Sequence, residues 1–161
     1  MKRTLSLSKL ALSRRAFLAL SAAAPLAPGL ARAEEKRMTV FKSPTCGCCG
    51  KWVEHMREAG FDVAVRNLDQ DALEAEKNRL GVLAPLRSCH TAEVAGYVIE
   101  GHVPASDVQL LMSFAPDVRG LAVPGMPIGS PGMEMGDEVE PYSTYAFSDR
   151  GDVRRFSQHG G

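Results

Sequence analysis

Apolar and polar positions follow two different periods from residue 38 to about residue 66. Residues 38–41 form a short run of β-favouring side chains, and residues 61–66 alternate between apolar and polar positions, so both segments are predicted to be strands. A helix is predicted between them, and Gly60 ends it. The apolar face of this helix carries Trp52, Val53, Met56 and Ala59.

The next segments continue this alternation of strands and helices. Asp69 is suited to cap the N-terminus of a second helix, and Gly81 is suited to end it. The further predicted elements are this helix over residues 70–80, a hairpin with strands at 91–94 and 97–100, and a third helix over residues 106–115. Their order, βαβαββα, predicts a thioredoxin-like α/β fold with a mixed central sheet flanked by helices.

The pattern is lost between residues 120 and 136. Gly and Pro punctuate this stretch and no regular period survives, so it is predicted to be a Gly/Pro/Met-rich loop. Residues 145–147 and 153–156 predict a C-terminal β-hairpin across a polar turn. Residues 158–161 are expected to form a flexible tail.

The first 33 residues have the composition of an export signal. They contain six basic residues and no acidic one, an Ala/Leu-rich stretch at 16–26 and the sequence Ala-Arg-Ala at 31–33, which predicts a signal peptide cleaved before Glu34. Residues 13–18, Ser-Arg-Arg-Ala-Phe-Leu, resemble a twin-arginine signal. The alternative is an ordinary secretory signal with two adjacent arginines, and both interpretations predict a periplasmic protein.

The length of 161 residues allows one compact domain. The predicted organisation is a signal peptide at 1–33, a linker at 34–37, a thioredoxin-like domain at 38–157 and a tail at 158–161. The chain has 19 basic and 19 acidic residues, and loss of the six basic residues of the leader leaves 13 against 19, a formal charge of −6. An acidic domain is a poor candidate for binding nucleic acid, and no mature segment is apolar enough to predict a membrane span.

Four cysteines form the candidate site. Cys46, Cys48 and Cys49 lie directly before the first predicted helix, where backbone N–H groups and the helix dipole stabilise thiolates. Cys89 precedes the strand after the second helix, and a thioredoxin-like topology would bring it to the same place. Sulfur ligation selects Cu(I), zinc or iron–sulfur clusters. The tight spacing of the first three cysteines favours thiolates that bridge more than one Cu(I).

Three other interpretations of the cysteines stay open. Cys46 and Cys49 have the C-x-x-C spacing of a thiol–disulfide oxidoreductase, although Cys48 inside the pair could scramble its disulfide. A structural zinc site usually comes as two separated C-x-x-C pairs, which this chain lacks. Two plain disulfides would require unstrained bridges between close neighbours.

Several other side chains are candidates for metal ligands or for donors to the ligands, although loop histidines are common on surfaces and loop methionines often fill gaps. These candidates are His90, His102, Met126, Met133 and Met135, with Met126 slightly favoured among the methionines. Two further histidines are expected to have no such role: His55 as a solvated helix residue and His159 as part of the tail.

Four separated motifs, at residues 45–52, 88–91, 97–104 and 120–127, occur in this order. Together they resemble the CopG-like family of exported copper-resistance proteins, whose thioredoxin-like domain was formerly catalogued as a domain of unknown function. The resemblance implies that Cys46, Cys48, Cys49 and Cys89 hold a thiolate-bridged copper cluster. It also implies a role in copper detoxification or Cu(I)/Cu(II) interconversion, with copper ions and other periplasmic copper-handling proteins as partners, and it leaves open whether the protein is an enzyme.

Overall fold

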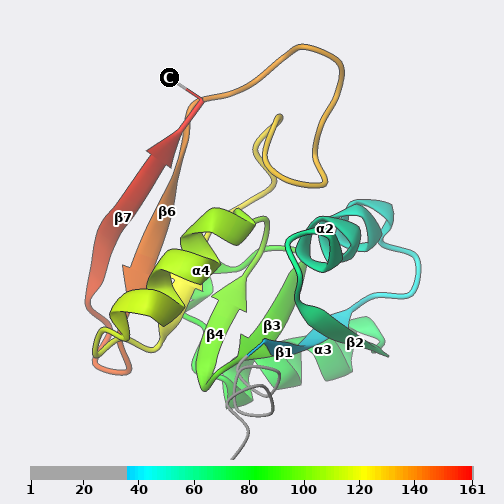
Figure 1. Ribbon diagram of the computed structural model, residues 1–161. Coiled ribbons are helices and arrows are strands. Elements are labelled where there is room, and N and C mark those ends of the chain that lie inside the picture. Colours follow the sequence, from blue (N-terminus) through cyan, green and yellow to red (C-terminus); the bar gives the residue numbers. More distant parts are fainter. Residues whose placement is uncertain (1–35, 161) are drawn as a thin grey trace, which may run out of the picture.

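The structure is a computed structural model that describes residues 36–160. The predicted signal peptide and the first residues of the predicted linker therefore lie outside the described residues. Within the described part, a single mixed sheet has the strand order β2-β1-β3-β4-β5-β6-β7 (Figure 1). No helix of this part is long and apolar enough to cross a membrane.

The sheet combines parallel and antiparallel pairs. Its strands are β1 (Arg37–Lys42), β2 (Asp62–Asn67), β3 (His90–Val94), β4 (Tyr97–Glu100), β5 (Gly120–Ala122), β6 (Tyr142–Phe147) and β7 (Val153–His159). The β1–β2 and β4–β5 pairs are parallel, and the other four neighbouring pairs are antiparallel. This arrangement confirms the α/β class with a mixed sheet, and the order of elements through α4 is compatible with the predicted thioredoxin-like fold.

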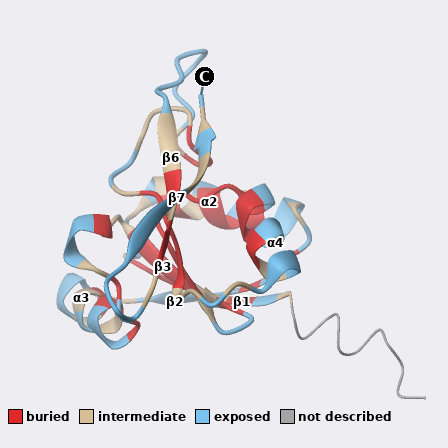
Figure 2. Ribbon diagram, turned by 90° about the vertical axis from the view of Figure 1, so that its left-hand side faces the viewer, coloured by how far each residue is buried: buried red, intermediate tan, exposed pale blue. Residues whose placement is uncertain are grey.

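Within residues 36–160, three α-helices cover the two faces of the sheet: α2 (Gly47–Glu58), α3 (Gln70–Arg79) and α4 (Ala105–Phe114). Alternate residues of β1 point to opposite faces, so Met38 and Val40 pack in one core with α2 and α4, whereas Phe41 packs in a second core with α3. Figure 2 shows the buried residues gathered on the strands and on the inner faces of the helices. The first core contains the apolar face of α2 that the sequence predicted.

The segment predicted to be an irregular loop contains a strand. β5 is only three residues long and all three are buried, so it shows neither alternation nor a measurable period. An added Cβ at Gly120 would lie 1.8 Å from the carbonyl oxygen of Val98, so glycine allows β5 to approach β4. A short 3-10 helix, η1 (Ala84–Leu86), also went unpredicted.

The C-terminal hairpin is longer than predicted. β6 begins at Tyr142, and β7 runs through His159, which pairs with Tyr142, so the expectation that residues 158 and 159 belong to a flexible tail is wrong. The buried carboxylate of Asp107 in α4 explains the order, because its Oδ2 lies 2.8 Å from His159 Nε2 and accepts hydrogen bonds from the hydroxyls of Thr144 and Ser157. These contacts fasten both hairpin strands to α4.

Candidate metal centre

The three clustered cysteines lie at the N-terminus of α2. β1 ends at Lys42, and a turn follows in which the Cys46 N–H donates to the Ser43 carbonyl. Cys46 is the N-cap residue, and its sulfur accepts a hydrogen bond from the Cys49 N–H at 3.4 Å. Cys48 and Cys49 therefore occupy the first turn, where the free N–H groups and the helix dipole favour negative charge on sulfur.

Cys89 reaches the same place from the segment between η1 and β3. Its Sγ lies 3.9 Å from Cys48 Sγ, which in turn lies 3.4 Å from Cys46 Sγ. The four cysteine sulfurs all lie within 4.8 Å of one another. The structure thus brings together the four residues that the sequence nominated, although Cys89 is 40 residues away from Cys49 along the chain.

Two of the four sulfurs are joined. Cys46 and Cys49 form a disulfide, whereas Cys48 and Cys89 are free thiols of intermediate exposure. The structure therefore represents an oxidised state of the C-x-x-C pair. In this state only two of the four sulfurs can act as thiolate ligands, and reduction of the disulfide releases the other two.

His102 and His90 flank the sulfur of Cys89. His102 Nε2 lies 3.1 Å from Cys89 Sγ, and His90 Nδ1 lies 3.4 Å from it. His102 Nδ1 donates to the Pro131 carbonyl at 2.7 Å, and since a carbonyl only accepts, the Nε2 lone pair faces the cysteine. The three side chains form a second group of donor atoms within 4.8 Å. Both histidines thus sit where a ligand or a partner of a ligand would be.

Burial favours the neutral forms of the His90 and His102 imidazoles and of the Cys89 thiol. It lowers the pKa of His90 well below its ordinary value, with further lowering from His102 and Lys77, and it also lowers the pKa of His102. Burial raises the pKa of the Cys89 thiol to about 12, and the nearby Cys48 adds to this rise. A metal ion that binds here must therefore displace the Cys89 proton, which makes metal affinity dependent on pH.

The ring of His90 is held by aromatic contacts. It is fully buried, its centroid lies 4.4 Å from that of Trp52, and it meets His102 edge-on at 5.0 Å. Trp52 is fixed in turn by a hydrogen bond from its Nε1 to the Val103 carbonyl at 2.9 Å. His90 Nε2 has no hydrogen-bond partner among the described residues. The packing fixes the position of this imidazole without using that nitrogen.

A buried ion pair holds the backbone next to Cys89. Glu100 Oε1 accepts from the Ser88 N–H and from Lys77 Nζ, both at 2.6 Å. Lys77 Nζ also lies 2.9 Å from Thr91 Oγ1. The side chains of Lys77 and Glu100 are 1% and 0% exposed. This network could not be predicted from the sequence, since its side chains come from α3, β3 and β4.

The methionine-containing loop runs past the cysteines. An added Cβ at Gly132 would lie 2.7 Å from the Cys48 carbonyl oxygen, and the Ser88 hydroxyl donates to the Gly125 carbonyl. Met126 and Met135 are 51% and 63% exposed. The backbone of this loop is thus in contact with both cysteine segments, while these two methionine side chains face solvent.

His55 differs from its prediction as a solvated residue. It is half-buried, and its Nε2 accepts a hydrogen bond from the Ala105 N–H at 3.1 Å. Pro104, the N-cap residue of α4, provides no side-chain cap, so His55 satisfies one of the free N–H groups there. Burial lowers the pKa of His55, against opposing effects of Glu134 and Glu58. The residue joins α2 to α4.

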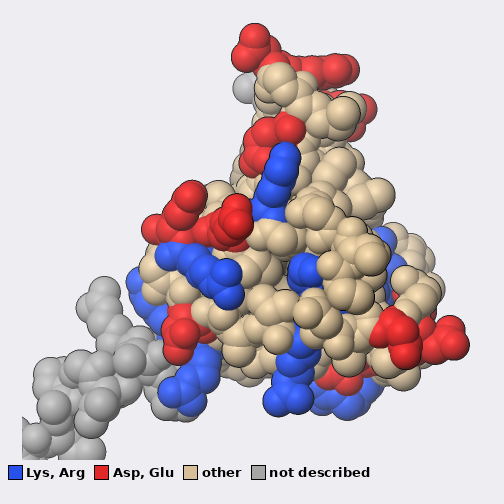
Figure 3. All heavy atoms as spheres, turned by 90° about the vertical axis from the view of Figure 1, so that its right-hand side faces the viewer, with Lys and Arg blue, Asp and Glu red and all other residues tan. Residues whose placement is uncertain are grey.

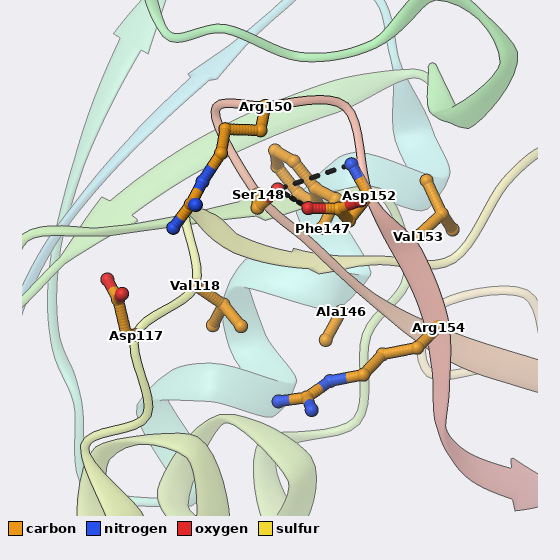
Figure 4. A pocket seen from close by; sticks show the side chains of 9 residues that line it. All are labelled: Asp117, Val118, Ala146, Phe147, Ser148, Arg150, Asp152, Val153 and Arg154. Carbon is orange, nitrogen blue, oxygen red and sulfur yellow. Dashed lines mark hydrogen bonds between the residues drawn. The ribbon is translucent and has the colours of Figure 1, made fainter.

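Other surface features lie apart from this centre. A pocket of about 190 Å³ is lined by residues of the β6–β7 hairpin and the segment after α4, and none of the four cysteines lines it. Figure 4 shows Asp117, Arg150 and Arg154 around this pocket, so its charges are mixed. Figure 3 shows interspersed basic and acidic groups on the body of one face and acidic groups at its projecting end. Neither feature competes with the cysteines as a metal site.

The fold and the site define an α/β protein with a four-cysteine centre at a helix N-terminus, an arrangement that suits a soft metal ion or disulfide exchange. Two solved structures, "Copper resistance protein copG" forms 1 and 2, are each 40% identical to the chain, with TM-scores of 0.72 and 0.71. They cover 78% and 77% of this chain and 98% of their own. Residues 86–133 match the family described as "Protein of unknown function, DUF411".

A search among curated proteins returns no match. The two structural matches share enough sequence, over enough of their length, to show common family membership. The chain belongs to the CopG family of copper resistance proteins.

Proposed function

We propose that this protein binds copper as Cu(I) through Cys46, Cys48, Cys49 and Cys89 and acts in copper resistance. The observation that carries the proposal is the convergence of four cysteine sulfurs within 4.8 Å. The names of the two solved relatives, both copper resistance proteins, point to the same metal. The family resemblance drawn from four sequence motifs supports it independently of the geometry.

The chemistry of the donor set favours copper. Thiolates are soft ligands that select Cu(I), and copper lies above zinc in the order of divalent affinities. Two metal–sulfur bonds of about 2.3 Å at a tetrahedral angle span roughly 3.8 Å. The separation of 3.9 Å between the sulfurs of Cys48 and Cys89 fits two ligands of one ion. Reduction of the Cys46–Cys49 disulfide supplies the other two thiolates.

More than one copper ion per chain is part of the proposal. Three sulfurs come from the four residues 46–49, so they cannot spread evenly around a single ion as two separated pairs do. Thiolates that each bridge two copper ions would accommodate three sulfurs at such close spacing. Such a cluster could also transfer electrons and interconvert Cu(I) and Cu(II). The predicted leader supports a periplasmic location for this activity, with export by the twin-arginine route for folded proteins.

Anaerobic titration of Cu(I) into reduced, metal-free protein tests the proposal. We expect more than one equivalent to bind in competition with a Cu(I) chelator, and Cys89→Ser to lower this stoichiometry while the fold is kept. Ser113→Ala is a matched control, because Ser113 is an exposed α4 residue whose hydroxyl donates to the Gln109 carbonyl of the same helix. Equal copper binding by Cys89→Ser and the control would remove Cys89 from the site.

A second candidate function is supported by the disulfide. The Cys46–Cys49 bond has the spacing and the helix N-terminal position of a thiol–disulfide oxidoreductase pair. This function predicts a reversible disulfide that exchanges with a dithiol substrate in the absence of metal. Metal-free protein that neither reduces a disulfide substrate nor oxidises a dithiol substrate would exclude this function and leave copper binding unaffected.

A further inference from the structure

The four sulfurs form a connected series rather than two separate pairs. The disulfide joins Cys46 to Cys49, Cys48 Sγ lies 3.4 Å from the Cys46 sulfur, and Cys89 Sγ lies 3.9 Å from Cys48. Cys48 is thus close to one sulfur of the disulfide and to the other free thiol. A structural disulfide would ordinarily be kept away from free thiols, because thiolates attack disulfide sulfurs.

Cys48 is placed to be the attacking thiol. It is the second residue of α2, and its Sγ is the free sulfur that lies 3.4 Å from the Cys46 sulfur of the disulfide. Cys46 precedes the helix and Cys49 is fully buried, so the attack on Cys46 takes place at the more accessible sulfur of the disulfide.

We propose that the centre is an internal thiol–disulfide relay, in which Cys48 moves the disulfide between the Cys46–Cys49 pair and a Cys48–Cys89 pair. In the first step the Cys48 thiolate attacks Cys46 Sγ; the Cys46–Cys48 bond forms as the Cys46–Cys49 bond breaks, and Cys49 leaves as a thiolate. In the second step Cys89 attacks Cys48 Sγ; the Cys48–Cys89 bond forms, and Cys46 leaves as a thiolate.

The relay is balanced without any oxidant or reductant. One disulfide and two free cysteines are present before and after it. The Cys49 thiolate released in the first step takes up the proton that Cys89 loses, so the number of protons is the same before and after the relay. The relay needs no metal, so it does not depend on the proposed copper function.

The relay has a consequence for the proposed copper site. In the isomer of this structure the two free thiols, Cys48 and Cys89, lie 3.9 Å apart. In the other isomer the free thiols would be Cys46 and Cys49, three residues apart at the start of α2. A single oxidation therefore always leaves one thiol pair for Cu(I). The two isomers differ in the position of the free thiols. In one isomer both thiols lie at the start of α2, and in the other one thiol lies on α2 and one lies in the segment before β3.

Disulfide mapping of metal-free protein tests the relay. Fully reduced protein receives one equivalent of the thiol oxidant diamide, which is then removed. Samples that stand without oxygen at mildly alkaline pH are quenched with acid at successive times before alkylation and trypsin digestion, so that later changes report exchange of an existing disulfide. Trypsin cleaves after Lys42, Lys51 and Arg87, which places Cys46, Cys48 and Cys49 on one peptide and Cys89 on another. The two isomers therefore differ in whether these peptides are cross-linked.

We expect wild-type protein to contain both pools, with the cross-link running from Cys48 to Cys89. Absence of any cross-linked peptide after prolonged incubation would overturn the relay. Cys48→Ser should lose the cross-link completely. A cross-link through Cys46 or Cys49 in that variant would show that Cys89 attacks the disulfide directly, and it would overturn the role of Cys48.

Cys89→Ser isolates the first step. With Cys89 absent, exchange among the clustered sulfurs should spread the alkyl label between Cys48 and Cys49. Label confined to Cys48 would show that the first step does not occur and would overturn the relay even if the other variants failed to fold. Since no copper is present in any arm, these results are separate from those that test copper binding.

Discussion

Removal of the Lys77 ammonium should be among the most destabilising single changes away from the cysteines. The side chains of Lys77 and Glu100 are 1% and 0% exposed, and their charged atoms lie 2.6 Å apart. In Lys77→Met the apolar stem is largely retained, but the carboxylate of Glu100 stays buried without its ion-pair partner. Breaking such a pair from one side costs about 3–5 kcal/mol. That is a large part of the roughly 5–15 kcal/mol that stabilises a typical domain.

Urea unfolding of reduced, metal-free protein measures this loss, and Arg79→Met is the matched control. Arg79 pairs with Glu76 and Glu93, but its side chain is 55% exposed, so solvent screens both pairs. Exposed pairs of this kind contribute about 0–1 kcal/mol. A loss below about 1 kcal/mol for Lys77→Met, or equal losses for the two variants, would refute the reasoning from burial.

Two further predictions test the contact of His55 with α4 and the close approach of β5 to β4. Burial lowers the pKa of His55 in the folded protein, so the contribution of His55 to the unfolding free energy is complete above its unfolded pKa of 6.5 and decreases as the pH falls below that value. His55→Gln keeps an acceptor for the Ala105 N–H, and it should make the unfolding free energy fall less steeply on acidification. An unchanged slope would count against this role of His55. Gly120→Ala should lower the free energy of unfolding in urea by about 1–3 kcal/mol or more, because the new methyl group meets the Val98 carbonyl. Gly50→Ala is the control: the added methyl group lies in open space on α2, so this change should be neutral or stabilising by about 0.5–1 kcal/mol. Similar results for both variants would contradict the close approach of β5 to β4.

Regular elements with a clear period were predictable from the sequence. The apolar face of α2 and the N-cap role of Asp69 in α3 are both present in the structure. Periodicity depends on several repeats of a pattern, and β5 is too short and too evenly buried to provide one. His159 was misplaced because its order depends on Asp107, which lies 52 residues earlier and shows no local sign of this contact.

The candidate site was predictable in its members but not in its bonding. The spacing of Cys46, Cys48 and Cys49 placed them at one helix start, and the expected topology brought Cys89 to them. The sequence left a disulfide and a four-thiol site open as alternatives, because the same four sulfurs serve both according to their oxidation state. The buried ion pair between Lys77 and Glu100 could not be predicted, because no spacing along the sequence indicates an ion pair between distant residues.

The most direct test of the central claim is the metal content of the protein purified without oxygen from copper-supplemented cells, together with a count of free thiols before and after metal removal. The account predicts more than one copper per chain and four thiols that become reactive when the metal is removed. Protein that carries zinc, or that carries no metal and holds a Cys46–Cys49 disulfide, would contradict it.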